Sequence, residues 1–349
     1  MKKVNNFKSS LWQKIFIFTY LFFVNIGFQF YTTKAQTTQN YNWKNVAIGG
    51  GGFVSAVITS KTEQNLVYAR TDVGGAYRWD SSSSSWVSLL DWVSEDEVGY
   101  LGVESLAIDP QSANKVYMLA GISYFNNGKT AILRSNDYGK TFTIIDVTSQ
   151  FKAHGNGMGR QAGEKLAVDP NNSNILYCGT RWNGLFKSVD AGTTWTRLNS
   201  LNVTTTSNEN GISFVLLDGS SVSGGATQRI IVGVSRNGTT NLYRSDDGGQ
   251  SFSAISGAPN TYMPHRTVLA NNGNLFVTYA NGAGPHGNTS GTEPMDNGQI
   301  WRYSISSGQW TNITPSGLNR AFGGISVDPR DGILALRQEM LWQMLFLAR

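Results

Sequence analysis

The sequence is poor in cysteine and in charged residues. Cys178 is the only cysteine among 349 residues, and Asp, Glu, Lys and Arg together make up 15%. One cysteine excludes an internal disulfide, and its place in the strand-like run Leu176–Gly179 favours a small buried hydrophobic residue. The histidines His154, His265 and His286 lack the spacing of metal ligands. The sequence therefore predicts no zinc site and no cofactor.

Helical periodicity is missing from most of the chain, whereas glycine is frequent at 39 residues. Hydrophobic residues make up 40% of the chain, which is enough for a sizeable core. A low charge content with abundant Gly, Ser, Thr and Asn is typical of an all-β protein with many tight turns.

Residues 1–35 form a segment of their own. Four lysines lie in the first 14 residues, an apolar run extends from Ile15 to about Phe28, and the segment ends on the small residue Ala35. This pattern predicts a secretory signal peptide cleaved after Ala35, and a secreted, periplasmic or cell-surface location. The alternative is an uncleaved anchor, but the apolar run is about 14 residues long, short of the roughly 20 that a membrane span needs.

The positive charge belongs to this leader. The formal charge is +5, and residues 1–35 hold five lysines and no acid, so 23 basic and 23 acidic residues remain. The pI of 9.2 therefore describes the signal peptide and not the folded protein. Nothing in the charge then favours a nucleic acid or, after cleavage, a membrane as partner.

One motif repeats along the chain: Ser, any residue, Asp, any residue, Gly, any residue, Thr or Ser, and an aromatic residue. Three segments match it fully and two match it in degraded form. The closing aromatic residues follow one another at steps of 56, 53, 57 and 58 residues; they are Trp86, Phe142, Trp195, Phe252 and Trp310. Asp-Pro turns keep the same phase, each after an apolar strand.

This Asp-box period predicts one four-stranded antiparallel blade per repeat, with the blades stacked around an axis. We expect an all-β fold, a β-propeller of six or seven four-stranded blades, closed or incompletely closed, over residues 36–332. The box aspartate accepts hydrogen bonds from backbone amides of its hairpin, and the glycine permits the left-handed backbone there. The box aspartates are therefore structural rather than catalytic.

Asp72 lies outside the box. It follows the strand-like run Leu66–Ala69 and precedes Gly74 and Gly75, which predicts a carboxylate at the inner edge of a blade. On the residues alone, two interpretations are open. The carboxylate could face a polysaccharide in a cleft, or it could hold its own loop as an Asx turn.

Several segments resemble glycoside hydrolase family 74, and the similarity runs from about Trp43 to Pro329. The resemblance begins with the glycine-rich segment Gly49–Val54 and is most specific in Ala69–Trp79, the run around Asp72. The other similar segments are Leu101–Ser105, Gly163–Pro170, Met263–His265 and Asn281–Pro285. The family contains xyloglucan-active endo-glucanases and related exo-acting hydrolases, built of two seven-bladed propellers with the substrate cleft between them.

The resemblance implies that Asp72 is the catalytic base of an inverting hydrolysis. It also implies a plant cell-wall polysaccharide, xyloglucan or a related β-glucan, as substrate. The general acid comes from the second propeller in this family, and that propeller is missing here. We therefore expect the chain alone to be weakly active or inactive. The cluster Glu95–Glu97 could be proposed as a substitute acid, but adjacent carboxylates in a polar loop are usually solvated.

Sugar rings stack on aromatic faces, with polar groups at their edges. Tyr124, Phe125 and Trp182 lie between predicted strands and are candidate stacking residues, and Arg160 and His265 are candidate edge contacts. Each has a core or turn residue as its alternative, because aromatic residues also build the interfaces between blades.

Two classes of function remain: a secreted hydrolase of β-1,4-glucan chains, and a non-catalytic Asp-box propeller that binds glycans or protein partners. A sialidase is a weaker third hypothesis, because its arginine triad and Tyr–Glu pair are not found.

The amino-acid composition changes in residues 333–349, which contain no Gly, Ser, Thr or Asn. Their composition suits a helix and does not suit a blade. We interpret them as the product of a shifted reading frame or a damaged gene; a C-terminal helix that caps the last blade is the alternative. Translating the downstream DNA in all three frames checks this, since propeller-like sequence should appear in one of them.

Overall fold

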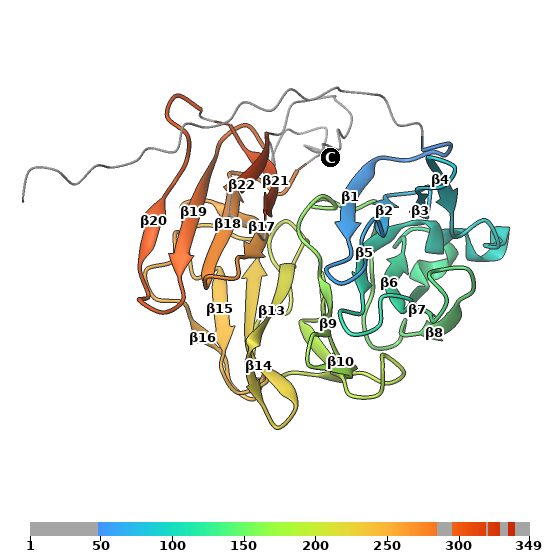
Figure 1. Ribbon diagram of the computed structural model, residues 1–349, viewed down its shortest axis with the longest axis horizontal. Helices are drawn as coiled ribbons and strands as arrows, with labels where there is room; N and C mark the ends of the chain where they lie inside the picture. Colours follow the sequence, from blue (N-terminus) through green and yellow to red (C-terminus); the bar gives the residue numbers. More distant parts are fainter. Residues whose placement is uncertain (1–47, 285–294, 319, 329–333, 339–349) are drawn as a thin grey trace, which may run out of the picture. The chain divides into compact units, whose positions relative to one another are not determined.

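The computed structural model describes residues 48–284, 295–318, 320–328 and 334–338, and all of these fall within one unit, Asn45–Phe346 (Figure 1). The proposed signal peptide, residues 1–35, lies outside the described residues. Two short 3-10 helices, η1 (Glu95–Leu101) and η2 (Asn126–Gly128), interrupt the strands. Among the described residues, no helix has the length and apolar character needed to cross a membrane.

Five four-stranded antiparallel sheets, the blades, follow one another along the chain. In each blade the chain runs from the inner strand to the outer strand in sequence order. Their strands are β1 (Val54–Thr59), β2 (Val67–Thr71), β3 (Ala76–Asp80) and β4 (Ser85–Ser88); β5 (Val103–Ile108), β6 (Val116–Gly121), β7 (Thr130–Ser135) and β8 (Thr143–Asp146); β9 (Leu166–Asp169), β10 (Asn172–Gly179), β11 (Leu185–Ser188) and β12 (Thr196–Arg197); β13 (Ile212–Ser223), β14 (Ala226–Val234), β15 (Leu242–Ser245) and β16 (Ser253–Ala254); and β17 (Met263–Leu269), β18 (Asn274–Ala280), β19 (Gly298–Ser304) and β20 (Trp310–Asn312).

The inner strands lie next to one another around a common centre, as Figure 1 shows. Contacts lead from β5 through β9, β13 and β17 to β21 (Phe322–Val327), and blade 1 joins this series through β2 and β5. β21 pairs with β22 (Leu334–Gln338) in a two-stranded sheet. The predicted all-β propeller of four-stranded blades is therefore confirmed.

The predicted number of blades is wrong, because the described residues form five complete blades rather than six or seven. The repeat itself explains the difference. Five closing aromatic residues occur, and after the last of them, Trp310, the 39 remaining residues are fewer than one repeat step of 53 to 58. Leu334–Gln338 form a strand and not the helix considered for residues 333–349. Residues 339–349 of that segment lie outside the described residues.

Three hairpins, which match the repeated motif fully, share one set of hydrogen bonds. In Ser188–Trp195, Asp190 Oδ1 accepts the Thr194 backbone N–H at 2.8 Å and Oδ2 accepts the Thr194 hydroxyl at 2.6 Å. Asp137 and Asp247 accept the same two bonds in their own hairpins. The predicted structural role of these aspartates is confirmed by this geometry.

The hairpins also connect neighbouring blades. The residue before the motif glycine adopts a positive φ, and its carbonyl points to the preceding blade. Tyr138 O accepts Arg78 Nη1 at 3.0 Å, Ala191 O accepts Arg134 Nη1 at 3.2 Å, and the Gly248 carbonyl accepts a lysine from blade 3. Trp195 of blade 3 packs into a cluster with residues of blade 2. The repeated motif therefore stabilises its own hairpin and also connects its blade to the neighbouring blade.

The three aspartates should make stability depend on pH. Hydrogen bonds from the side chains and backbone of Thr141, Thr194 and Ser251 lower the pKa of Asp137, Asp190 and Asp247 to about 2, from an ordinary value near 3.8. Because the folded pKa is depressed, this stabilisation is complete above about pH 4 and is lost as the pH falls toward 2. In urea unfolding, the wild type should exceed the triple Asp→Asn variant in stability near neutral pH, and the difference should shrink below about pH 4. Asp96→Asn, at an exposed position outside the hairpins, serves as the control. A difference that does not change with pH would contradict this account.

Candidate functional site

Five of the six candidate site residues, all but His265, lie in loops at the same end of the blades. In an antiparallel blade, the connection from the second to the third strand and the connection to the next blade leave from one end. Asp72 lies in the β2–β3 loop, Tyr124 in the β6–β7 loop, Arg160 in the β8–β9 loop and Trp182 in the β10–β11 loop. We call this end the loop face.

Asp72 is buried, and both of its carboxylate oxygens are engaged. Oδ1 accepts the Phe53 backbone N–H at 2.7 Å, and Oδ2 pairs with Arg160 Nε at 3.0 Å. The Arg160 guanidinium also lies over the Phe53 ring, with its central carbon 5.3 Å from the ring centroid. Burial is the main cause that lowers the pKa of Arg160, and Asp72 opposes it. The structure thus brings two sequence candidates, Asp72 and Arg160, into one ion pair.

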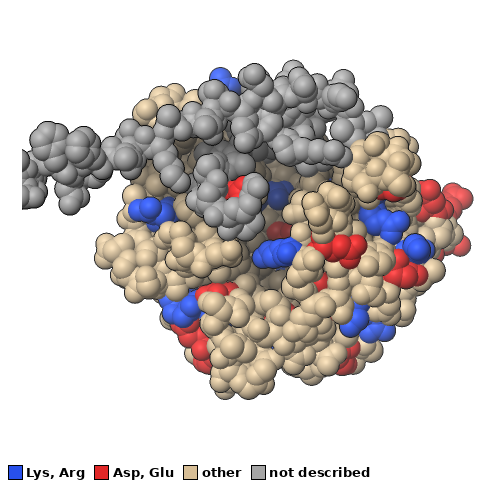
Figure 2. Space-filling view, in the orientation of Figure 1, with Lys and Arg blue, Asp and Glu red and all other residues tan. Residues whose placement is uncertain are grey.

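Charged side chains cross the centre of the propeller beneath the loop face. Arg70 of blade 1 donates its Nε to Glu164 Oε1 of blade 3 at 2.9 Å, and Glu164 Oε2 accepts the Ser105 hydroxyl of blade 2 at 2.7 Å. Arg266 of blade 5 donates to the Ser55 carbonyl of blade 1 at 2.7 Å. We call Arg70, Glu164 and Arg266 the axial plug. Figure 2 shows basic and acidic side chains bordering a hollow near the middle of the face in view.

Glu104 is the centre of a second buried group of charges. Its Oε1 pairs with Lys165 Nζ at 2.7 Å and with Arg181 Nε at 2.6 Å, and its Oε2 accepts the His154 backbone N–H at 2.7 Å. Burial opposes the charge, but Arg181 and Lys165 outweigh it and lower the pKa of Glu104 to about 2. Burial lowers the pKa of Lys165 to about 8 in spite of Glu104.

Tyr124, His154 and Trp182 form a strip of rings on the loop face. The Tyr124 and His154 rings meet edge to face with centroids 5.4 Å apart, and the His154 and Trp182 rings are stacked at 6.4 Å. The Tyr124 side chain is 59% exposed, and its hydroxyl accepts the Asn156 side-chain amide at 2.7 Å. Phe125 packs against Tyr124 with ring centroids 4.8 Å apart. Burial, then the cations Arg181 and Arg160, lower the pKa of His154 to about 4.

His265 occupies a different environment from the other candidates. It is 1% exposed and lies within β17 at a β-bulge, where its Nε2 is 2.7 Å from the Gly282 carbonyl. Its own carbonyl accepts the Gly163 backbone N–H at 2.7 Å. These contacts fit the core alternative that the sequence left open for His265, and burial lowers its pKa to about 4.

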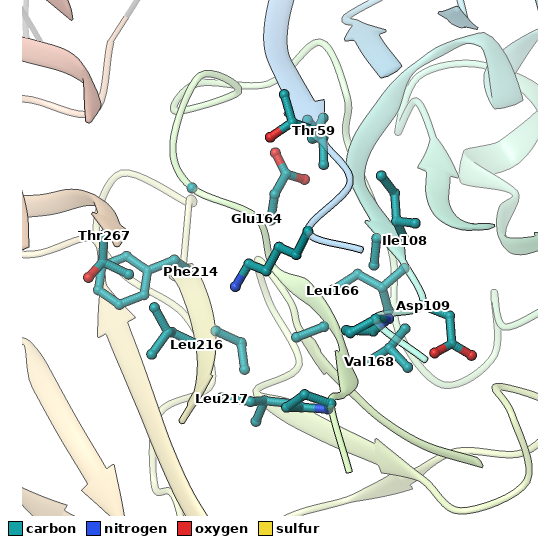
Figure 3. A pocket seen from close by; sticks show the side chains of 18 of the residues that line it. Thr59, Ile108, Asp109, Glu164, Leu166, Val168, Phe214, Leu216, Leu217 and Thr267 are labelled. Carbon is teal, nitrogen blue, oxygen red and sulfur yellow. The ribbon is translucent and has the colours of Figure 1, made fainter. Parts of the chain in front are cut away.

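A cavity of about 310 Å³ lies between the inner strands, away from Asp72. Figure 3 shows Leu166, Val168, Phe214 and Leu216 around it, with Glu164 at its border. Since Asp72 and the aromatic strip are not among its lining residues, the cavity is separate from the candidate site. The acidic run Glu95–Glu97 lies in η1. Within the described part of the chain, no group of His, Cys, Asp and Glu could hold a metal ion.

Sequence reasoning missed His154 and the charges beneath the loops. A usable signal was present: Glu104 interrupts the apolar run Val103–Ile108, and Lys165 immediately precedes the apolar β9. A charge inside an otherwise apolar inner strand must find a partner, because a buried unpaired charge is costly. Which partner it finds depends on neighbouring blades and cannot be read from the local sequence.

Comparisons with known proteins agree on the relatives of this chain. A scan against protein-family models finds no match. A xyloglucanase of Acetivibrio thermocellus, Xgh74A, is 42% identical over 320 residues, which cover 85% of this chain and 37% of that protein. The solved structure of a glycoside hydrolase family 74 (GH74) enzyme from Niastella koreensis is 56% identical with a TM-score of 0.76, and the match covers 83% of this chain and 41% of that one.

A GH74 xyloglucanase structure from Xanthomonas campestris is 36% identical with a TM-score of 0.74, and the match covers 84% of this chain and 43% of that one. The chain therefore spans about two fifths of the length of these relatives.

The two site histidines should stay neutral well below their ordinary range. Since burial holds the pKa of His154 and of His265 at about 4, against an ordinary value of 6.5, the unfolded chain binds these protons first. Stability should therefore fall as the pH drops from about 6.5 to about 4. Imidazole NMR titration checks this, with His154→Gln and His265→Gln assigning the signals. A titration midpoint near 6.5 for either imidazole would contradict this prediction, because it would show that solvent reaches that ring.

Proposed function

Since the chain belongs to glycoside hydrolase family 74 over the part that it shares with these relatives, we propose that it acts in a secreted hydrolase of xyloglucan. In this proposal the enzyme cleaves the β-1,4-glucan backbone with inversion, and Asp72 is the general base that activates the attacking water. The relatives' printed names support xyloglucan as the substrate.

The observation that carries the proposal is the fixation of the Asp72 carboxylate on the loop face. The Phe53 backbone N–H and Arg160 each take one lone pair, one on each oxygen. An ionised carboxylate has about four acceptor sites, so lone pairs remain for a water. A general base must hold its water in a fixed geometry, and two rigid partners provide that orientation.

Exposed aromatic and apolar side chains around Asp72 suit a long neutral polysaccharide. Phe53 and Val73, its neighbours in contact and in sequence, are 37% and 38% exposed, and Phe125 is 38% exposed. Rings for pyranose stacking come from Phe53, Phe125, Tyr124 and Trp182, while Val73 adds an apolar contact and Asn156 offers polar groups at the edge. Xyloglucan carries no charge to be matched, which agrees with a mature chain of zero formal charge.

The general acid of the proposed reaction lies beyond the described residues. An inverting pair needs a second carboxyl roughly 6.5–9.5 Å from the base. Glu104 and Glu164 are the other carboxylates of the buried groups, and cations engage both. We therefore assign the acid to the portion of the relatives that this chain does not cover, and expect the chain alone to bind xyloglucan without cleaving it.

A non-catalytic glycan-binding propeller is the second candidate. The specific observation in its favour is that the aromatic strip is present on a chain in which Asp72 has no described acid partner. In this case binding would be the whole function, and Asp72 would serve only to hold Phe53 and Arg160 in place.

The decisive experiment supplies the uncovered portion. We would fuse the chain to the part of the Acetivibrio thermocellus xyloglucanase that it does not match, and measure reducing ends released from soluble xyloglucan. Asp72→Asn keeps the size of the side chain and an acceptor for Phe53 N–H but cannot take a proton. Removal of the general base should lower kcat by about 10²- to 10⁴-fold.

Asp96→Asn is the matched control, since it removes one carboxylate from the loop face and should leave kcat unchanged. NMR of the first-formed product should show the inverted anomer. Full activity of Asp72→Asn refutes the assignment of the base. Binding of xyloglucan by both the chain and the fusion, with no reducing ends from either, favours the second candidate.

A further inference from the structure

We propose that Glu104 is a positioning residue, which fixes the β8–β9 loop so that Arg160 meets Asp72 and His154 lies between Tyr124 and Trp182. The value of this arrangement for sugar binding rests on the proposed function, whereas the arrangement itself does not. Glu104 touches neither Asp72 nor the exposed rings, so it acts through the loop.

The carboxylate of Glu104 connects three parts of the chain. It is 2% exposed and enters from β5, where the register of β5 and β6 shifts at a β-bulge between Val103 and Ser105. Bulges turn a side chain out of the regular alternation of a strand. Here the bulged residue aims its carboxylate at the next blade, where Oε2 accepts the backbone N–H of His154 at 2.7 Å.

Arg181 extends this attachment along the loop. It is bound to Glu104 through its Nε at 2.6 Å, and its Nη1 donates to the Met158 carbonyl at 2.7 Å. A Cβ at Gly157 would lie 2.8 Å from the Arg181 Cζ, so the loop backbone packs directly on the guanidinium. The segment from His154 to Met158 is thereby held at both ends by one pair of charges.

Arg160 follows two residues later, and its backbone is held from below. The Arg160 carbonyl accepts Arg70 Nη1 of the axial plug at 3.0 Å. The Arg160 side chain leaves the loop on the side of Asp72 and pairs with it at 3.0 Å. A displacement of the segment before Arg160 would therefore move both the guanidinium that contacts Asp72 and the ring of His154.

The chemistry of the site requires a carboxylate at position 104. Lys165 and Arg181 are both nine-tenths or more buried, and one anion between them satisfies two cations and a backbone N–H together. Breaking such a buried pair on one side is strongly destabilising, because a charge stays behind without its partner. Glutamine keeps the size and one oxygen but neutralises the anion, so it weakens the attachment of the loop without opening a cavity.

The test uses the full chain and the imidazole titration of His154. The groups that face His154 are Glu104, Arg181 and Arg160; Glu104 raises its pKa, and the two cations lower it. If the loop stays in place in Glu104→Gln, loss of the anion lowers the His154 midpoint further below about 4. If the loop is released, the ring becomes hydrated and its midpoint rises toward 6.5. The proposal predicts the rise.

Asp218→Asn is the matched control, because it removes a buried carboxylate from an ion pair with Arg229, 2.8 Å away, on strands that do not hold the loop. It should leave the His154 midpoint unchanged. Binding of soluble xyloglucan should fall by about 10- to 100-fold in Glu104→Gln and stay unchanged in Asp218→Asn. If the wild type binds no xyloglucan, the proposed function fails while the titration still decides the role of Glu104.

A His154 midpoint that stays or falls in Glu104→Gln overturns the proposal. If that variant does not fold, the double variant Glu104→Gln with Lys165→Met removes one charge of each sign and is titrated in its place. Hydrogen exchange of the unaltered chain gives an independent check. The His154 amide should be protected, since its acceptor is a buried carboxylate, and exchange as fast as in an open loop would also overturn the proposal.

Discussion

The arrangement of the blades depends on the axial plug of Arg70, Glu164 and Arg266. Propeller blades ordinarily adhere to their neighbours around the circumference, here through the hairpin carbonyls of Tyr138, Ala191 and Gly248. The plug adds bonds that cross the centre. Arg70 joins blade 1 to blade 3, and Arg266 joins blade 5 to blade 1. Arg266 thereby connects blade 5 directly to blade 1 across the centre.

The axial plug also separates the cavity between the inner strands from the loop face. Its charged groups lie between the apolar cavity of the inner strands and the loop face, since Glu164 borders the cavity while Arg70 reaches the Arg160 carbonyl. Four inner strands carry a β-bulge at a polar residue, Ser55, Glu104, Ser213 or His265, and Ser55 accepts bonds from both arginines of the plug. Asp72 itself is paired within the loop face, by the Phe53 backbone N–H and by Arg160.

The repeated part of the fold could be predicted from the sequence, and the site could be predicted only in outline. The period of the closing aromatic residues predicts four-stranded blades, because each hairpin is specified by residues close in sequence. It also places Asp72, Tyr124 and Trp182 after second strands, and hence on one face. The Asp72–Arg160 pair is 88 residues apart in sequence and depends on a neighbouring blade, so no local pattern indicates it. His265 shows the converse case: a residue of the family resemblance lies in the core, as the alternative left open by the sequence has it, and a bulge places it there.

The distribution of buried charge limits which residues could serve as the general acid of the proposed reaction. A general acid must be protonated near neutral pH, which requires an apolar setting or a second carboxylate that raises its pKa. Glu104 has the opposite surroundings. Asp72, Glu104 and Glu164 pair with four cations, namely Arg70, Arg160, Lys165 and Arg181, and the pKa of Glu104 is lowered to about 2. Arg181 and Lys165 favour the ionised form of Glu104, so Glu104 is not suited to hold a proton as a general acid. We therefore infer that Glu104 is not the general acid of the proposed reaction, which agrees with an acid that comes from outside these ion pairs.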